Sequence, residues 1–385
     1  MKTFLFFAMA LTIGSYLFYV WRRPPSRRYG AIDAIVPAYN EEPCLEQTLL
    51  PLLQNKYVHR VICVNDGSTD GTAQVLARMS EQWGDKLLAI NQTNTGKGGA
   101  LMNGLSHVTT ETVFLTDADT FVPNDDGLGY MLAEVERGAD AVGGIPSSNL
   151  SNAGLLPHIR ATVKMPMIML KRTFQQLVGG APFIISGACG LFKVEVLRKY
   201  GFSDRTKVED LDLTWTLVAA GYKVRQANRC VVYPQECTSA REEWKRWRRW
   251  IVGYAVCMRL HKGLLFSRFG LVSIFPMFAL VVFGVVTYAI SWTQVTINHG
   301  PHLIAGVLFP LLWVAVVTMI GAISALHHRK FVLMPLASLA VSYVLLSYAI
   351  WLIHGIKGLI TGREPKRDKP TRYSNEVVGT SSSAG

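Results

Sequence analysis

The uneven distribution of charged residues limits the folds open to this chain more than any other feature of its sequence. Every acidic residue lies between Asp33 and Glu243, except three near the C-terminus. Three long stretches contain no Asp, Glu, Lys or Arg: 3–20, 269–328 and 331–356. Uncharged apolar runs of about 20 residues can cross a bilayer. The sequence therefore predicts a membrane segment, then a soluble domain, then further membrane segments.

Basic residues indicate on which side of the membrane the soluble domain lies. Four arginines follow the first uncharged segment: Arg22, Arg23, Arg27 and Arg28. No small-residue cleavage site follows that segment, which favours a retained anchor over a cleaved signal peptide. The positive-inside rule then predicts a cytosolic domain in a multi-pass protein of the cell inner (plasma) membrane. The formal net charge of +12 favours anionic lipid and phosphorylated ligands as partners, and we expect no nucleic acid.

Five regions are expected along the chain. They are an N-terminal transmembrane anchor with a basic stop (1–28), a cytosolic domain (29–240), a basic Trp-rich interface helix (241–265), a C-terminal transmembrane bundle (266–360) and a polar tail (361–385). Spans are expected at about 270–292, 303–325 and 332–354. Three spans would place the tail outside, whereas its Lys and Arg residues favour the inside. A re-entrant hairpin in place of the last span would reconcile the two arguments.

Within the domain, the segment at about 155–178 has helical periodicity, with apolar residues on one face and Arg160, Lys164 and Lys171 on another. Such a basic amphipathic helix can lie in the membrane interface. The alternative is an ordinary surface helix that packs on the domain.

The rest of the domain alternates short apolar strands with amphipathic helices. Strands are expected at 31–38, 60–66, 87–91 and 112–119, and helices at 46–55, 72–83 and 99–108. This alternation predicts an α/β domain with a mostly parallel sheet. Ligands bind at the carboxyl ends of strands in such sheets. Polar residues follow the expected strands at these ends: Asn40, Glu42, Asp66, Asp117 and Asp119.

Seven short motifs occur in a fixed order along residues 30–260. They are PAYNEE (37–42), VNDGSTD (64–70), NTGKGGAL (94–101), DAD (117–119), SGA (186–188), ED (209–210) and R-x-x-RW (246–250). Together they resemble the family 2 glycosyltransferases with a GT-A fold, and within them the membrane-embedded polysaccharide synthases. The chain looks most similar to poly-N-acetylglucosamine and chitooligosaccharide synthases. The resemblance implies a UDP-sugar donor and inversion at the transferred sugar.

The acidic motifs suit a nucleotide diphosphate. Negative charge grows on the diphosphate as the glycosidic bond breaks, and a divalent cation can stabilise it. We expect Asp119 to bind Mg²⁺ or Mn²⁺ and Asp117 to address the nucleotide, although both could instead cap a helix. Asp66 can accept hydrogen bonds from the nucleoside or act only as a turn residue. Lys97 offers a point charge to the diphosphate. Asn40 and Glu42 complete the expected donor-binding set.

Asp210 is the expected general base, because the acceptor hydroxyl must lose its proton as it attacks the sugar. Glu209 would support it. Both could also complement a helix dipole. Val208 stands where the resemblance implies a Thr in this motif. Ser186 and Gly187 resemble an acceptor-side loop in which small residues leave room for a sugar.

The R-x-x-RW motif places three side chains on one helix face. Arg246 and Arg249 could clamp the diphosphate, Trp250 could stack on a sugar of donor or acceptor, and Trp247 could contact the acceptor. A basic helix with Trp anchors at the membrane surface is the alternative. Processive relatives usually carry Gln in the first place of this motif, which Arg246 occupies here.

These observations favour an inverting transferase that moves a sugar, with N-acetylglucosamine as first choice, from a UDP-sugar to a growing β-linked glycan. Addition of one sugar to a polyprenyl phosphate or other lipid-linked acceptor is the first alternative. A non-catalytic membrane receptor or regulator on a degenerate GT-A domain is the second, and the intact acids argue against it. An accessory membrane subunit is left open.

Overall fold

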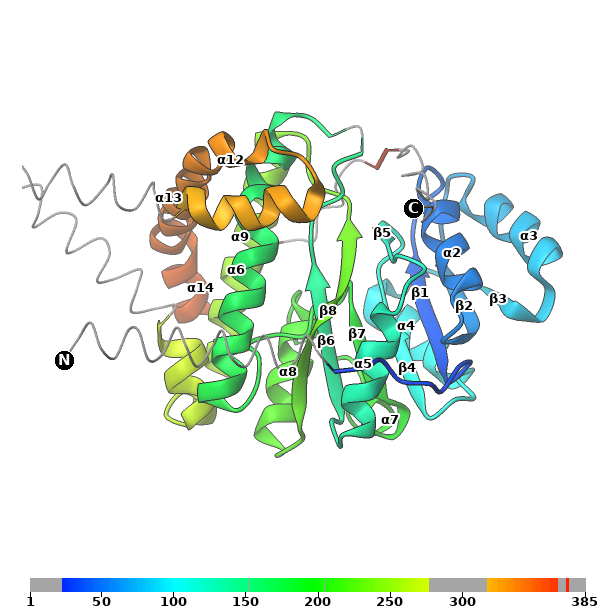
Figure 1. Cartoon of the computed structure of the whole chain (residues 1–385). Coiled ribbons are helices and arrows are strands. Elements are labelled where there is room, and N and C mark those ends of the chain that lie inside the picture. Colours follow the sequence, from blue (N-terminus) through cyan, green and yellow to red (C-terminus); the bar gives the residue numbers. More distant parts are fainter. Residues whose placement is uncertain (1–22, 152, 204, 277–316, 366–371, 374–385) are drawn as a thin grey trace, which may run out of the picture.

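The computed structural model describes residues 23–151, 153–203, 205–276, 317–365 and 372–373 (Figure 1). The expected span at 3–20 lies outside these residues, as do most of the spans expected at 270–292 and 303–325. In the part of the chain that the structure describes, no helix combines the length and apolar character needed to cross a bilayer.

An eight-stranded sheet forms the centre of the domain. Its strands are β1 (Ile32–Ala38), β2 (Val58–Asp66), β3 (Leu87–Gln92), β4 (Thr112–Leu115), β5 (Thr120–Phe121), β6 (Ala141–Pro146), β7 (Gly190–Lys193) and β8 (Val224–Pro234). The spatial order is β3-β2-β1-β4-β7-β6-β8-β5. Pairing is parallel from β3 to β4 and between β6 and β8, whereas β7 and β5 run antiparallel to their neighbours. The expected α/β class is confirmed, with a sheet that is parallel in one half and mixed in the other.

The strands in the parallel half are buried on both faces, which explains their continuous apolar runs. In β2, Ile62 and Val64 pack into one core while Val61 and Cys63 pack into a second core on the opposite face. The helices that cover the sheet are α2 (Leu45–Gln54), α3 (Thr72–Trp83), α4 (Gly96–Ser106), α5 (Gly127–Glu136), α7 (Val194–Tyr200) and α8 (Glu209–Ala219). Residues of α4, α7 and α8 belong to the first core, and residues of α2, α3 and α5 to the second.

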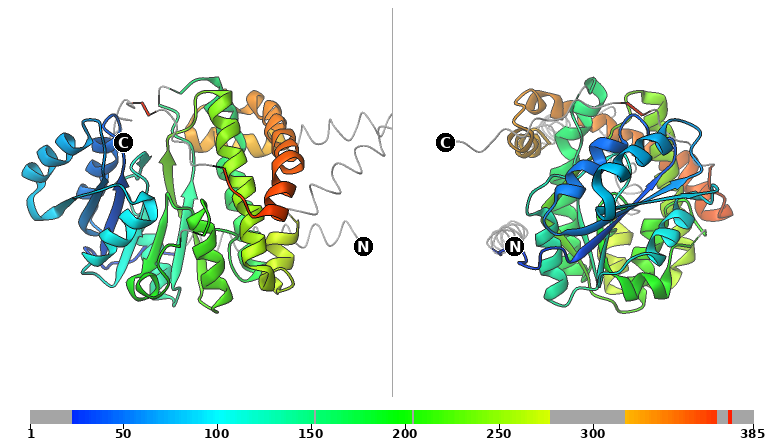
Figure 2. Two further views of the ribbon diagram at one scale, coloured as in Figure 1. Left: turned by 180° about the vertical axis from the view of Figure 1, so that it is seen from behind. Right: turned by 90° about the vertical axis from the view of Figure 1, so that its right-hand side faces the viewer.

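Two long helices stand beside the β6–β8 half of the sheet. They are α6 (Leu155–Gly179) and α9 (Ala240–Leu260), and they confirm the helices expected at 155–178 and 241–262. Shorter segments pack against their outer side: α12 (Leu333–Leu336), η4 (Ala337–Ala340), α13 (Val341–Ile350), η5 (Trp351–Gly355) and α14 (Ile356–Thr361). Figure 2 shows this helical layer and the α2–α3 end of the domain on opposite sides of the sheet.

Of the three basic residues expected on one face of α6, Lys171 is exposed, whereas Arg160 and Lys164 do not form the exposed cationic flank that the sequence suggested. Arg160 and Lys164 are largely buried and form ion pairs with Glu236, which follows β8. Arg160 also pairs with Glu243 of α9 at 2.6 Å. Buried cations need such partners. The apolar face is the more open one, with Met167 45% exposed.

Trp215 fixes the position of α8 on the sheet. The side chain is fully buried, its indole N–H donates to the carbonyl of Phe183 at 3.0 Å, and its ring meets the ring of Phe183 edge to face. Because α8 begins at Glu209, this contact also determines where the acidic pair Glu209-Asp210 lies.

We predict that Trp215→Ala lowers the free energy of unfolding of the full chain by about 3–5 kcal/mol, because it leaves a large cavity in the core. Trp215→Phe keeps an aromatic ring there and should cost clearly less. Thermal or denaturant unfolding of the purified protein measures both. Equal stability of wild type and Trp215→Ala would contradict the packing role.

Candidate active site

Lys97 connects three elements at the carboxyl ends of the parallel strands. It lies in the first turn of α4, directly after Gly96, whose φ of +82° suits glycine. Its Nζ is 2.5 Å from Oδ1 of Asp117, after β4, and 3.5 Å from Oε1 of Glu209, at the start of α8. Three residues that the sequence placed in one site, and that lie far apart in the chain, are thus brought together.

The predicted base lies in a pocket beside this lysine. The pocket is lined by Lys97, Leu101, Leu115, Ile185, Ser186, Gly187, Phe192, Phe202, Glu209, Asp210 and Leu213. Two backbone N–H groups donate to Asp210, from Gly187 to Oδ2 and from Leu211 to Oδ1, both at 2.9 Å. These bonds hold the carboxylate in one orientation toward the acceptor-side loop.

Burial raises the pKa of Asp210 above its ordinary value, and the neighbouring charge of Glu209 raises it further. Lys97 and the two backbone N–H groups act in the opposite direction. A carboxylate with a raised pKa takes up a proton more readily, so this environment suits a general base.

Gly187 leaves room for the Lys97 ammonium at this point. A Cβ atom there would lie 2.8 Å from Nζ of Lys97 and 3.5 Å from Oδ2 of Asp210. Any side chain would therefore push the lysine from its position. This geometry fits the expectation of small residues in the Ser186-Gly187 loop. Contact of the loop with an acceptor stays a prediction.

Asp66 closes the loop that carries Lys97. The side chain is buried at the end of β2, and its Oδ1 accepts hydrogen bonds from the backbone N–H of Thr95 and from the side-chain amide of Gln92, both at 2.8 Å. Asp66 thus has the turn-stabilising role considered from the sequence. Its binding to a nucleoside stays a prediction.

Asn40 and Glu42 join the loop after β1 to the loop after β2. Asn40, with φ of +52°, accepts a hydrogen bond from the N–H of Thr69 at 2.7 Å, and Glu42 accepts one from the N–H of Gly71 at 2.8 Å. Both residues therefore shape the strand ends where a nucleotide would bind. Direct donor contacts by either residue stay predictions.

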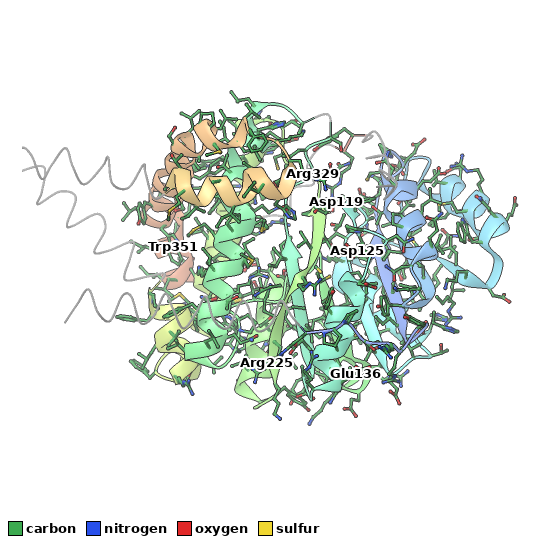
Figure 3. The ribbon with its side chains drawn as sticks, viewed as in Figure 1. Asp119, Asp125, Glu136, Arg225, Arg329 and Trp351 are labelled. Carbon is green, nitrogen blue, oxygen red and sulfur yellow. The ribbon has the colours of Figure 1, made fainter. Side chains whose placement is uncertain are left out.

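Asp119 lies beside a cation supplied by the C-terminal tail. Its carboxylate forms an ion pair with the guanidinium of Arg372. The same guanidinium reaches Glu41, with Nε 2.8 Å from Oε2. Burial raises the pKa of Asp119, and the charge of Arg372 opposes that rise. Figure 3 shows Asp119 at the upper end of the sheet, with Arg225 and Glu136 at the opposite end.

This arrangement fits a divalent cation. Two largely buried carboxylates converge on one positive charge, and carboxylate oxygens are the ligands that Mg²⁺ and Mn²⁺ prefer. Among the described residues, no group of three or more His, Cys, Asp or Glu side chains could enclose a metal ion. Further ligands would therefore come from the donor diphosphate and water, as is usual for Mg²⁺ bound with phosphates.

The R-x-x-RW residues face a separate group of buried charges. Arg246 pairs with Glu236 at 2.9 Å and with Glu243, which also accepts a hydrogen bond from the indole of Trp247 at 2.7 Å. The Trp250 ring lies 5.5 Å from the guanidinium carbon of Arg246. Arg246 thus has one carboxylate partner just after β8 and one on α9, outside the pocket of Lys97 and Asp210. Clamping of a diphosphate by Arg246 and Arg249, and sugar contact by Trp247 and Trp250, stay predictions.

Four residues of these two clusters were missed from the sequence: Glu41, Glu236, Glu243 and Arg372. Glu41 stands between two residues that were selected, and only its burial distinguishes it. Arg372 lies in a segment that was interpreted as a polar tail. Its partner Glu41 is 331 residues away in the chain, so no local pattern could have revealed the contact.

The fold and this site are those expected of a glycosyltransferase, and the comparisons agree. The sequence model of "Glycosyl transferase family 2" matches residues 33–201. The chain is 66% identical over 375 residues, 97% of its length and 94% of the relative's, to "Uncharacterized glycosyltransferase YaiP" of Escherichia coli (strain K12). The chain therefore belongs to glycosyltransferase family 2 and is an enzyme of that class.

Two further similarities are more distant. The chain is 28% identical over 265 residues to a poly-beta-1,6-N-acetyl-D-glucosamine synthase of Staphylococcus epidermidis, a match that covers 65% of this chain and 63% of that synthase. A solved mannosyltransferase, PcManGT from Pyrobaculum calidifontis in complex with GDP-Man and Mn²⁺, superposes with a TM-score of 0.56 at 20% identity, over 93% of this chain and 99% of that one. The latter shows the shared fold, and the expected GT-A class is confirmed.

We predict that Arg372→Ala lowers the free energy of unfolding of the metal-free protein by about 3 kcal/mol, because two buried carboxylates lose their cation. Mn²⁺ should then raise the melting temperature of the variant more than that of wild type, since binding to the folded state stabilises it. Thermal unfolding with and without Mn²⁺ measures both. Arg363→Ala, at an exposed position before Arg372, is the matched control. Identical Mn²⁺ responses of Arg372→Ala and wild type would contradict this assignment.

A second prediction concerns pH. Asp210 acts as a base only when ionised, so activity should fall as the pH drops through its raised pKa. Glu209→Gln removes a charge that raises this pKa, so the acid limb of kcat/KM should move to lower pH. Glu195→Gln, on the exposed side of α7, should leave the limb in place. A limb that stays fixed or moves to higher pH in Glu209→Gln would contradict the coupling.

Proposed function

We propose that this chain is an inverting transferase that moves N-acetylglucosamine from its UDP-linked donor to the hydroxyl of a growing β-linked glycan. We further propose that it adds sugars processively, at the cytosolic side of the inner membrane. The observation that carries the transferase chemistry is the orientation of Asp210, fixed by two backbone N–H groups in a pocket shared with Lys97.

The reaction needs one displacement and one proton transfer. The acceptor oxygen forms a bond to the anomeric carbon while the bond from that carbon to the diphosphate oxygen breaks. The acceptor proton passes to Asp210, and UDP leaves with the bonding electron pair. Because the base assists a single displacement at one face of the sugar, the configuration at the anomeric carbon is inverted. General bases of this kind contribute about 10²–10⁴-fold to rate.

The donor end of the site must stabilise charge on the departing diphosphate. Lys97 would turn from Asp117 and Glu209, which lie 2.5 and 3.5 Å from its Nζ, toward a phosphate oxygen. Asp119 and Glu41 would hold the divalent cation. When bound, that cation supplies Lewis-acid stabilisation of the diphosphate.

Support for a polymer product comes from the synthase relative, whose name states that it makes poly-beta-1,6-N-acetyl-D-glucosamine. The shared region covers 65% of this chain and 63% of that synthase. The charge-free stretches that bracket the domain support the membrane location. Transfer of a single sugar to a polyprenyl phosphate is the alternative, and Arg246 in the place of the usual Gln is the observation that favours it.

The test is to incubate membranes that contain the full chain with a panel of UDP-sugars and Mg²⁺ or Mn²⁺, and to identify products by mass spectrometry. We expect a β-linked polymer from UDP-N-acetylglucosamine. A lipid carrying one sugar would overturn polymerisation, and the use of another donor would overturn the sugar assignment.

Asp210→Asn should reduce turnover by at least about 10²-fold while the affinity for UDP, measured by calorimetry, stays near that of wild type. Glu195→Gln serves as the control with full turnover. Near-normal turnover in Asp210→Asn would remove this residue from the role of base.

A further inference from the structure

The segment after the predicted second C-terminal span begins in contact with the catalytic domain. His327 forms a hydrogen bond of 3.0 Å with the hydroxyl of Tyr233 in β8, and the two rings stack with centroids 5.9 Å apart. His328 forms a hydrogen bond of 3.1 Å with the hydroxyl of Ser147, just after β6. These contacts place residues 327–328 on the side of the membrane where the domain lies.

The same segment also ends in contact with that domain. The Glu364 carboxylate accepts a hydrogen bond from the hydroxyl of Thr206 and another from the backbone N–H of Lys207, both at 2.5 Å. Further along, Arg372 reaches Glu41 and Asp119 in the candidate active site. Residues 364 and 372 therefore lie on the same side as residues 327–328.

Between these two ends, the chain packs along the domain. Residues of α12 and η4 contact α6, and residues of α13, η5 and α14 contact α9. Ile350 and Trp351 are buried in the same core as Ile251 and Ala255 of α9. Figure 1 shows α12, α13 and α14 following the outer side of α6 and α9, and Figure 3 shows Trp351 on this side of the molecule.

A helix that crosses a bilayer has its ends on opposite sides of about 30 Å of hydrocarbon. The residues that flank 333–361, at 327–328 before it and at 364 and 372 after it, bind one domain, which lies on one side only. We infer that this segment is not a span but lies along the membrane surface and returns the chain to the catalytic side. This inference rests on the membrane location proposed above.

The outward face of the segment fits the boundary between lipid headgroups and acyl chains. Its exposed residues include Leu352, Ile353, Ile356 and Ile360, which recur at helical spacing and are 44–69% exposed. Lys357 lies among them, as expected for an interfacial helix whose basic side chain reaches the headgroups.

A second exposed apolar segment, after α9, lies on the same side of the molecule. It contains Phe266, Leu271 and Phe275, of which Phe266 is 86% exposed. The left view of Figure 2 shows this segment and α12–α14 on the side away from α2 and α3. The two apolar surfaces are thus positioned to meet one bilayer.

The inference removes the conflict in the predicted topology. With 333–361 at the surface, two spans remain after α9, and an even number of crossings returns the tail to the cytosolic side. The Lys and Arg residues of the tail then obey the positive-inside rule, and Arg372 can reach Asp119.

Single-cysteine labelling of the full chain tests the topology. All six native cysteines are buried, so wild type serves as the blank for a membrane-impermeant maleimide. We expect Leu326→Cys and Thr361→Cys, both at exposed positions, to be labelled in inside-out vesicles and protected in spheroplasts. Asn298→Cys, between the two predicted spans, should show the opposite pattern.

Labelling of Thr361→Cys from outside would overturn the inference. If Asn298→Cys instead behaves like Leu326→Cys, the two spans themselves are wrong, and the membrane proposal fails rather than the path of 333–361.

Depth is tested with a fluorophore on Ile353→Cys and nitroxide lipids. We expect a nitroxide near the headgroup to quench it more strongly than one deep in the acyl chain, and Gln82→Cys on α3 to be quenched by neither. Stronger quenching by the deep nitroxide, or no quenching at all, would overturn the surface position.

Discussion

The ion pairs of Lys97 hold the catalytic site together. One ammonium group neutralises carboxylates from two elements, Asp117 after β4 and Glu209 at the start of α8. Among the described residues, the ion-pair groups of Lys97 and Arg372, with Asp210 beside them, comprise five carboxylates and two cations. A diphosphate would add to this negative charge, so it can bind only if a dication accompanies it or the carboxylates rearrange. This charge balance favours binding of the diphosphate together with a divalent cation.

The predictions that the structure confirmed were those based on local sequence patterns. Apolar periodicity predicted the strands of the parallel half, α3 at 72–83 and the long helices α6 and α9. A strand buried on both faces is a continuous apolar run, and a helix buried on one face has apolar residues at helical spacing. The convergence of Lys97, Asp117, Glu209 and Asp210 followed from the rule that ligands bind at strand carboxyl ends and from the family motifs.

The features that the sequence did not predict depend on contacts between residues far apart in the chain. The basic residues Arg160 and Lys164 were expected at a surface, yet Glu236 and Glu243, more than 70 residues away, bring them inside. The antiparallel strand β7 is only four residues long. Its residues do not alternate between apolar and polar, so the sequence did not predict a strand there. Binding of a phosphate by Arg246 stays a prediction, but its ion pairs with Glu236 and Glu243 were not foreseen. Its buried carboxylate neighbours could not be read from spacing.

The short pairing of β5 with β8 has a consequence for how this enzyme could change its donor. Thr120 pairs with Pro234, and the backbone N–H of Gln235 donates to the carbonyl of Asp119 at 3.0 Å. The backbone of Asp119, the proposed metal ligand, is therefore held by the segment that follows β8 and cannot follow a substrate of different shape. A change in sugar selectivity would therefore have to come from substitutions in the loops around Ser186 and Asn94. The proposed cation site would keep its position.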